Sequence, residues 1–339
     1  MQPYSDDQDR TAKPPDERKS ALDAWVSRQL GQPLCGQPAS ADASFRRYFR
    51  YKFSDDSGPR SLVAMDAPPP QEDCRPFVRV ARLFAEAGVH VPAILAEDME
   101  RGFLLLADMG QRTWLELLDA DNADQRFRRA IDALIAIQSH SRDDVLPHYD
   151  AAVLRRELEL FPEWFIERQL DVRVDATLRA ELDALFALLI ERALNQGRVY
   201  VHRDFMPRNL MDSEPDPGII DFQDALYGPI SYDITCLFKD AFISWPEPRV
   251  QRWWQHYWQQ AQAAGLPVPA SFETFLHDCD LMGVQRHLKV IGIFARICHR
   301  DGKPKYLADV PRFVGYLRTV IARRPELQPL GNLLDRLLP

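Results

Sequence analysis

Three oxygen-bearing side chains stand at spacings that suit phosphoryl transfer. Asp204 and Asn209 lie in the run 202–209, which fits H-R-D-x-x-x-x-N, and Asp221 follows a pair of isoleucines. Phosphoryl transfer needs one carboxylate beside the attacking hydroxyl and oxygen ligands for the Mg²⁺ that neutralises the phosphates. The pattern therefore predicts Asp204 as the catalytic base and Asn209 and Asp221 as magnesium ligands. Each residue alone could cap a turn, so the prediction depends on their joint spacing.

Other nucleotide-binding signatures are absent from the sequence. No two glycines are two residues apart, which excludes G-x-G-x-x-G, and no G-x-x-x-x-G-K-[ST] occurs. Asp221-Phe222-Gln223 stands where a protein kinase has D-F-G, and no A-P-E follows. These departures favour a small acceptor over a protein.

The elements that must position these residues change character along the chain. Two strand-like runs, 44–53 and 61–65, flank a turn sequence and predict a hairpin, and residues 93–97 and 102–107 are also extended. A helix is expected at 76–87. After residue 108 the spacing of apolar residues becomes helical, at 114–118, 127–137, 151–169, 178–194 and from 249 onward.

This pattern predicts an α+β protein with a small antiparallel-sheet lobe and a larger, mostly helical lobe. The expected division is a disordered arm at 1–19, a nucleotide-binding lobe at 20–107, and a catalytic and substrate-binding lobe at 108–339.

Composition excludes several classes of function. The formal net charge is −8 and the pI is near 5.6, which does not indicate a nucleic-acid-binding protein. No segment approaches the ~18 consecutive apolar residues of a membrane span, and the first residues lack an apolar signal-peptide core. We therefore expect a cytoplasmic protein with no membrane or nucleic-acid partner. Five widely spaced cysteines indicate neither a disulfide framework nor a zinc site.

The run 202–209, the segment 219–222 and the sequence Tyr-Gly-Pro-Ile-Ser-Tyr-Asp at 227–233 resemble the aminoglycoside phosphotransferase family. The resemblance extends over roughly residues 20–325. It implies a bilobal protein-kinase-like fold and the use of ATP and Mg²⁺.

Residues 41–50, 65–69 and 285–290 resemble one branch of that family, the anomeric sugar kinases of peptidoglycan recycling. This closer resemblance implies phosphorylation of the anomeric (C1) hydroxyl of N-acetylmuramate and N-acetylglucosamine. The partner would be a small amino sugar.

The resemblance also implies roles for residues outside the catalytic set. The turn over the nucleotide phosphates would consist of Ser44, Phe45 and Arg46. The hinge whose backbone binds adenine would consist of Leu106, Ala107, Asp108 and Met109. The catalytic loop would be held in place by His202, Arg203 and Asp233.

One departure concerns the phosphate-binding lysine of kinases. Alignment of residues 63–66 with the kinase V-A-I-K strand places Asp66 where that lysine belongs. Either the alignment of this strand is wrong, or Arg46, Arg47 or Arg50 supplies the cation, since guanidinium also binds phosphate.

A basic stripe on the expected helix 284–303 bears on the acceptor. It could be an ordinary solvated face, or it could place Arg286, Lys289 or Arg296 where they bind an acidic acceptor such as the lactyl carboxylate of N-acetylmuramate. Cationic aminoglycosides would fit poorly beside it. Phe205 lies within the catalytic run 202–209 and could stack on a sugar ring.

Two alternatives stay open at the level of sequence. The acceptor could be another small hydroxyl compound, such as an aminoglycoside, choline or homoserine. The missing lysine and the glycine-free phosphate turn could instead indicate a nucleotide-binding pseudokinase, although the intact catalytic set argues against it.

Overall fold

The computed structural model describes residues 16–41, 45–55 and 58–338, and its contacts divide the chain into two units. The sheet unit comprises residues 1–75 and 93–108, and the helical unit comprises residues 76–92 and 109–339. Most of the predicted arm at 1–19 lies outside the described residues. Its last three residues belong to helix α1 (Glu17–Leu30), so the predicted arm extends too far along the chain.

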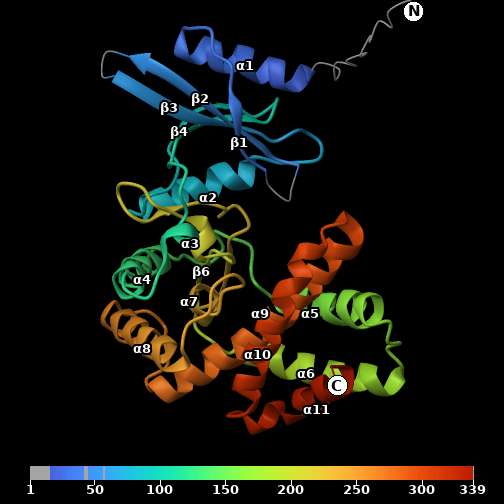
Figure 1. Ribbon diagram of the computed structural model, residues 1–339. Helices are drawn as coiled ribbons and strands as arrows, with labels where there is room; N and C mark the ends of the chain where they lie inside the picture. Colours follow the sequence, from blue (N-terminus) through green and yellow to red (C-terminus); the bar gives the residue numbers. More distant parts are fainter. Residues whose placement is uncertain (1–15, 42–44, 56–57, 339) are drawn as a thin grey trace, which may run out of the picture. The chain divides into compact units, whose positions relative to one another are not determined.

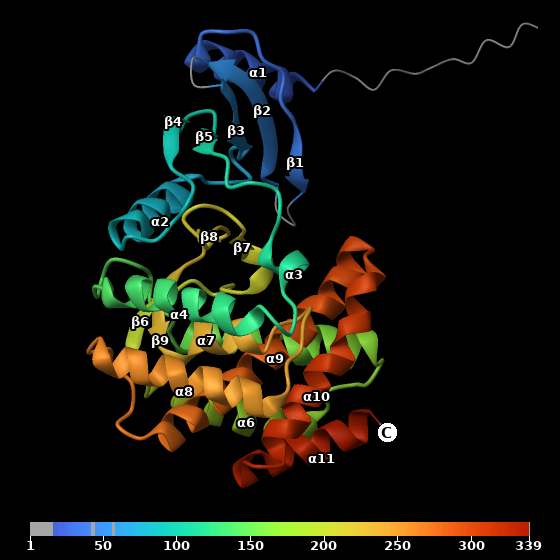
Figure 2. The same ribbon diagram turned by 60° about the vertical axis from the view of Figure 1, so that its left-hand side comes forward.

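Five antiparallel strands form the sheet of this unit in the order β1-β2-β3-β5-β4 (Figures 1 and 2). Their bounds are Gln37–Ala41 (β1), Arg47–Asp55 (β2), Gly58–Asp66 (β3), Ile94–Asp98 (β4) and Phe103–Ala107 (β5). The hairpin expected from the sequence is confirmed, since β2 and β3 pair with Phe49 opposite Ala64.

Helix α1 covers one face of this sheet. Side chains alternate between the two faces of a strand, so every second residue of a strand can face α1. Phe49 and Tyr51 on β2 and Phe103 and Leu105 on β5 form one core with the apolar residues of α1. The members contributed by α1 are Leu22, Trp25 and Val26.

Helices dominate the helical unit, as the sequence predicts (Figure 2). Its helices are α2 (Arg75–Glu86, with Arg75 counted in the sheet unit), α3 (Trp114–Leu117), α4 (Ala123–Ser139), α5 (Ala151–Leu158), α6 (Ala176–Leu194), α7 (Ser231–Phe238), α8 (Glu247–Ala263), α9 (Phe272–Asp301), α10 (Val310–Ile321) and α11 (Gln328–Leu337). A π-helical segment η1 (Phe161–Gln169) and three 3₁₀ segments, η2 (Pro207–Asn209), η3 (Pro304–Asp309) and η4 (Pro325–Leu327), complete the helical elements. Over the described ranges, no helix has the length and apolar character needed to cross a bilayer.

The assignment of α2 differs from the predicted domain boundary, which placed it with the strands. Its apolar face packs within the helical unit, where the rings of Phe77 and Phe84 lie 4.9 and 5.8 Å from that of Phe222. Phe222 directly follows Asp221, so α2 supports the segment that carries a predicted magnesium ligand.

The helical pattern predicted at 151–169 is confirmed, but the α-helix α5 ends at Leu158 and the segment continues from Phe161 as the π-helical η1. Pro162 has no N–H to donate, and η1 continues instead with wider hydrogen bonds such as that from Leu170 to Phe165. The turn at the break lies against α9, where an added Cβ on Gly292 would come within 2.4 Å of the Leu160 carbonyl carbon and oxygen.

Gly292→Ala is therefore expected to lower the free energy of unfolding by about 1–3 kcal/mol through overpacking. Gly315→Ala is a matched control, because it lies exposed in α10 with no atom within 4 Å of an added Cβ. That variant should be stabilised by up to about 1 kcal/mol through helix propensity. Urea unfolding of both variants checks the expectation, and equal effects would contradict the close packing at Gly292.

Candidate active site

The catalytic loop begins where β6 (Arg198–Val201) ends. This strand pairs with β9 (Leu226–Pro229), and α7 follows β9 directly. Asp233, in the first turn of α7, accepts hydrogen bonds from the backbone N–H groups of His202 at 2.6 Å and Arg203 at 2.9 Å. Burial raises the pKa of Asp233 to about 7, although the two N–H donors favour its ionised form. One buried carboxyl group thus fixes the backbone immediately before Asp204.

His202 connects the catalytic loop to the segment that carries Asp221. Its Nε2 lies 3.1 Å from the carbonyl oxygen of Ile220, and its Nδ1 accepts a hydrogen bond from the N–H of Asp204 at 3.3 Å. This pairing requires a neutral ring with the proton on Nε2. Burial lowers the pKa of His202 to about 4, so the ring holds two backbone segments and does not act as an acid at neutral pH.

Asn209 and Asp221 are brought together by the short ladder of β7 (Leu210–Met211) and β8 (Gly218–Ile219). The side-chain nitrogen of Asn209 donates to the Asp204 carbonyl oxygen at 2.9 Å and to Asp221 Oδ2 at 3.2 Å. Because both bonds use the nitrogen, the amide oxygen is the atom of Asn209 left for a cation. An amide oxygen beside a carboxylate is a donor set that suits Mg²⁺.

Gln223 holds the other oxygen of Asp221, which the sequence did not reveal. Its Nε2 donates to Asp221 Oδ1 at 2.9 Å, and the residue is 9% exposed. Asp221 itself has a φ of 66°, a conformation that non-glycine residues seldom adopt. Hydrogen bonds from two amide side chains therefore set the position of this carboxylate.

Arg286 on α9 is the predicted acceptor residue closest to Asp204. Its Nη2 lies 3.9 Å from Asp204 Oδ1, and the residue is 2% exposed. Its Nε and Nη1 are buried without a hydrogen-bond partner in the described chain. Buried guanidinium nitrogens normally have partners, so this group is suited to bind an anionic or hydroxyl-bearing ligand beside Asp204.

Lys289, one turn further along α9, is committed to a buried cluster centred on Glu157 of α5. Its Nζ lies 2.7 Å from Glu157 Oε1 and 3.1 Å from the hydroxyl of Tyr232. Arg203 of the catalytic loop, with a φ of 78°, binds the same carboxylate oxygen. Gln285 donates to the other oxygen at 3.1 Å, and the hydroxyl of Tyr149 also donates there.

The charges in this cluster compensate one another. Burial alone would raise the pKa of Glu157, but Lys289 and Arg203 lower it to about 2. We therefore place Lys289 and Arg203 among the groups that position the loop. The expected basic stripe is not a uniform solvated face, because Arg286 and Lys289 are buried while Arg300 is exposed.

Glu157→Gln is expected to lower the free energy of unfolding by about 3–5 kcal/mol, because it leaves the buried Lys289 and the partly buried Arg203 without their anion. Glu159→Gln is the control, since Glu159 binds Arg155 and Arg179 near the surface and should change stability by less than about 1 kcal/mol. A second change, Lys289→Met, should recover part of the loss. Similar effects of Glu157→Gln and Glu159→Gln in urea unfolding would contradict the role of the cluster.

The effect of Glu157 should also depend on pH in a definite direction. Its pKa in the folded protein is about 2 against an ordinary 4.5, so ionised Glu157 stabilises the fold fully above about pH 4.5. The stabilisation declines as the pH falls from 4.5 towards 2. The difference between the wild type and Glu157→Gln should shrink over the same interval.

Two further predicted acceptor residues are not brought to Asp204 by any contact in the described part of the chain. Phe205 is fully buried, and its ring lies 5.7 Å from that of His202, so it packs in the core and offers no face to a sugar. Arg296 is half-buried further along α9, where burial lowers its pKa. The sequence could not separate Arg296 from Arg286, because both lie on the basic stripe expected on the helix 284–303.

The predicted nucleotide-binding residues lie mostly in the sheet unit. Ser44 is outside the described residues, Phe45 is 67% exposed, and its N–H donates to Glu72 Oε1 at 3.0 Å. Leu106 and Ala107 end β5, and the side chain of Asp108 accepts hydrogen bonds from Arg50 and Ser61, both at 2.6 Å. Met109 is the first residue of the second segment of the helical unit.

Asp66 binds two arginines and does not take the place of a phosphate-binding lysine. It is fully buried and binds Arg18 Nε at 2.6 Å and Arg47 Nη2 at 2.6 Å. The other two candidate cations also face carboxylates, since Arg50 binds Asp108 and Arg46 lies 4.0 Å from Glu72. Asp66 is therefore a structural carboxylate within the sheet unit.

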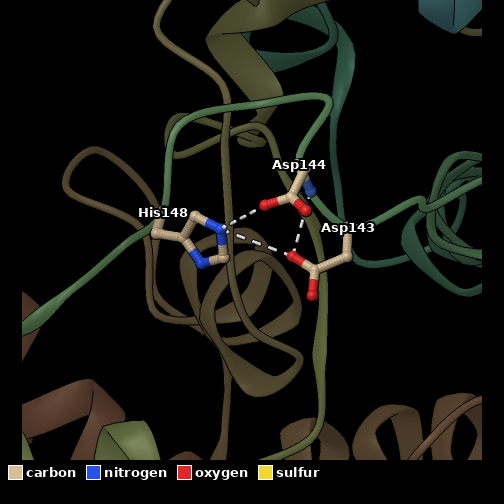
Figure 3. A group of neighbouring side chains, drawn as sticks. All are labelled: Asp143, Asp144 and His148. Carbon is tan, nitrogen blue, oxygen red and sulfur yellow. Dashed lines mark hydrogen bonds and ion pairs between the residues drawn. The ribbon is translucent and has the colours of Figure 1, made fainter.

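A separate group of possible metal ligands lies on the loop before α5 (Figure 3). His148 Nε2 lies 3.4 Å from carboxylate oxygens of both Asp143 and Asp144, and the two aspartates are exposed. Exposed carboxylates commonly gather in this way without an ion, and we assign the group no role.

Comparison with known proteins places this geometry in a family. A model of the phosphotransferase enzyme family matches residues 36–272. The N-acetylmuramate/N-acetylglucosamine kinase of Pseudomonas aeruginosa is 64% identical, covering 95% of this chain and 97% of that protein. The protein of the same name from Neisseria meningitidis serogroup B is 47% identical, covering 88% and 90%.

Solved structures share the fold at low identity. Choline kinase LicA from Streptococcus pneumoniae has a TM-score of 0.64 at 14% identity and covers 90% of this chain and 100% of its own. ADP-bound aminoglycoside phosphotransferase APH(2'')-Ib has a TM-score of 0.55 at 13% identity, with 89% and 98% coverage. Both support the predicted α+β, kinase-like fold.

Proposed function

The chain belongs to the phosphotransferase enzyme family, and we propose that it phosphorylates the anomeric hydroxyl of N-acetylmuramate and N-acetylglucosamine with ATP and Mg²⁺. The names of the relatives that are 47–64% identical over most of their length support these acceptors. The observation that carries the chemistry is the set of Asp204, Asn209 and Asp221, joined by direct hydrogen bonds. A cytoplasmic location, where ATP is available, is part of the proposal.

In this proposal, Asp204 accepts a hydrogen bond from the anomeric hydroxyl, orients its oxygen towards the terminal phosphate and takes its proton. The ring oxygen makes this hydroxyl more acidic than an ordinary alcohol. Arg286, beside Asp204, donates hydrogen bonds to the acceptor or to the phosphate oxygens that approach it.

Asn209 Oδ1 and the Asp221 carboxylate would hold Mg²⁺, which supplies neutralisation of charge on the phosphates. Asp233, His202 and Gln223 keep these groups in position before substrate arrives. On the nucleotide, the backbone of residues 106–109 would bind adenine and residues 44–46 the phosphates.

The acceptor assignment is tested by ADP release from the purified protein with ATP, Mg²⁺ and a panel of acceptors. Turnover is expected with both amino sugars, and none with choline, homoserine or an aminoglycoside. The matched control is 1-deoxy-N-acetylglucosamine, which lacks the anomeric hydroxyl and should not react. Turnover with choline or an aminoglycoside but with neither sugar would replace the proposed acceptor.

A further inference from the structure

A pocket of about 400 Å³ opens in the helical unit beside the catalytic loop. One wall is Arg208, which directly precedes Asn209 in η2, and another is Phe242, which follows α7. The segment η3 supplies Lys305, Tyr306 and Asp309. The pocket therefore begins within the same short loop that carries Asp204 and Asn209.

The pocket combines aromatic faces with two cations. The guanidinium of Arg208 lies 4.9 Å from the ring centroid of Phe242, and Lys305 Nζ lies 5.3 Å from that of Tyr306. Stacking places both cations at the lining without neutralising them. Among the described residues, neither Arg208 nor Lys305 forms an ion pair with a carboxylate within 4.0 Å.

The acidic residues of the lining already have local partners. Glu116 caps α3, where its Oε2 accepts a hydrogen bond from the N–H of Thr113 at 3.0 Å. Asp309 lies 3.7 Å from Arg312, one turn along the chain. The cations are thus the charges of this pocket that a ligand can use, and they favour an anionic ligand.

We propose that this pocket binds the carboxylate of the lactyl side chain of N-acetylmuramate, with Lys305 and Arg208 as its cations. The inference rests on the proposed function, since it concerns one of the two acceptors. The two sugars differ in this substituent alone, which N-acetylglucosamine lacks. Contacts in the pocket therefore set the preference between them.

The chemistry of the sugar places this carboxylate away from Arg286. The lactyl group is on C3, two ring carbons from the anomeric carbon, and extends outward from the ring. Arg286 Nη2 lies 3.9 Å from the Asp204 carboxylate and so serves the reacting hydroxyl. We therefore assign the carboxylate to a second cationic site, and the pocket beside Arg208 supplies one.

The test compares Lys305→Met and Arg208→Gln with the wild type, using kcat/KM for both sugars. The readout is the ratio of kcat/KM for N-acetylmuramate to that for N-acetylglucosamine, because a general loss of activity cancels in it. Removing one charge-assisted hydrogen bond should lower this ratio by about tenfold in either variant. Lys303→Met, an exposed lysine outside the pocket lining, is the matched control and should keep the wild-type ratio.

A substrate change gives an independent readout. The wild type should lose about tenfold in kcat/KM on the methyl ester of N-acetylmuramate, which has no carboxylate, and Lys305→Met should discriminate less between acid and ester. A wild-type ratio in both pocket variants would overturn the inference while leaving the proposed function intact. Failure of the wild type on both sugars would overturn both.

Discussion

Replacing Asp204 with asparagine is expected to lower kcat by about 10³-fold while leaving the affinity for nucleotide nearly unchanged. The amide keeps the shape of the side chain but cannot take the proton of the acceptor hydroxyl, and such proton transfer contributes about 10²–10⁴-fold. The side chain is half exposed, so the change should leave the fold intact. Steady-state kinetics and nucleotide binding by calorimetry measure the two quantities separately.

Asp224→Asn is the matched control for this result. Asp224 is an exposed aspartate three residues beyond Asp221. Arg203 donates a hydrogen bond to its backbone carbonyl oxygen, which the substitution keeps. Removal of its charge should change kcat by less than about twofold, as expected for a group outside the reacting set. A near-normal kcat in Asp204→Asn would remove Asp204 from the mechanism.

The second large effect is expected at Asp221. Asp221→Asn removes the anionic member of the proposed magnesium site, which should lower kcat by about 10³-fold and raise the Mg²⁺ concentration needed for half-maximal rate. Gln223→Met is a graded comparison, because it keeps the carboxylate but removes its 2.9 Å hydrogen bond. It should weaken magnesium binding by about 10–100-fold.

The measurement is a titration of rate against Mg²⁺ for each protein, with Mn²⁺ binding followed by electron paramagnetic resonance. Chelation of the metal should abolish wild-type turnover and restoration of Mg²⁺ should recover it. Equal dependence on Mg²⁺ in the wild type and in Asp221→Asn would contradict the assignment of Asp221 as a ligand.

Local sequence patterns were enough to predict the hairpin of β2 and β3, the change to helices after residue 108, and the spacing that brings Asn209 next to Asp221. Their partners were beyond reach of any local pattern. Glu157 binds Arg203 across 46 residues and Lys289 across 132, and nothing around Glu157 in the sequence marks it as part of the loop.

The same limit explains the misplaced acceptor residues. Helical spacing puts Arg286 and Lys289 on one stripe. The spacing alone does not show that Lys289 binds Glu157 while Arg286 faces Asp204. Asp66 is similar, because the strand pattern places it correctly but cannot show that Arg18 and Arg47 bind it. In both cases the partners of the side chain come from tertiary contacts, which local sequence does not show.

The position of the phosphate in the product tests the proposed anomeric phosphorylation directly. Purified protein should be incubated with ATP, Mg²⁺ and N-acetylglucosamine or N-acetylmuramate, and the product examined by phosphorus and proton NMR. We expect a phosphorus signal coupled to the anomeric proton of each sugar. A phosphate coupled to the protons on C6, or ADP formation with no sugar phosphate, would contradict it.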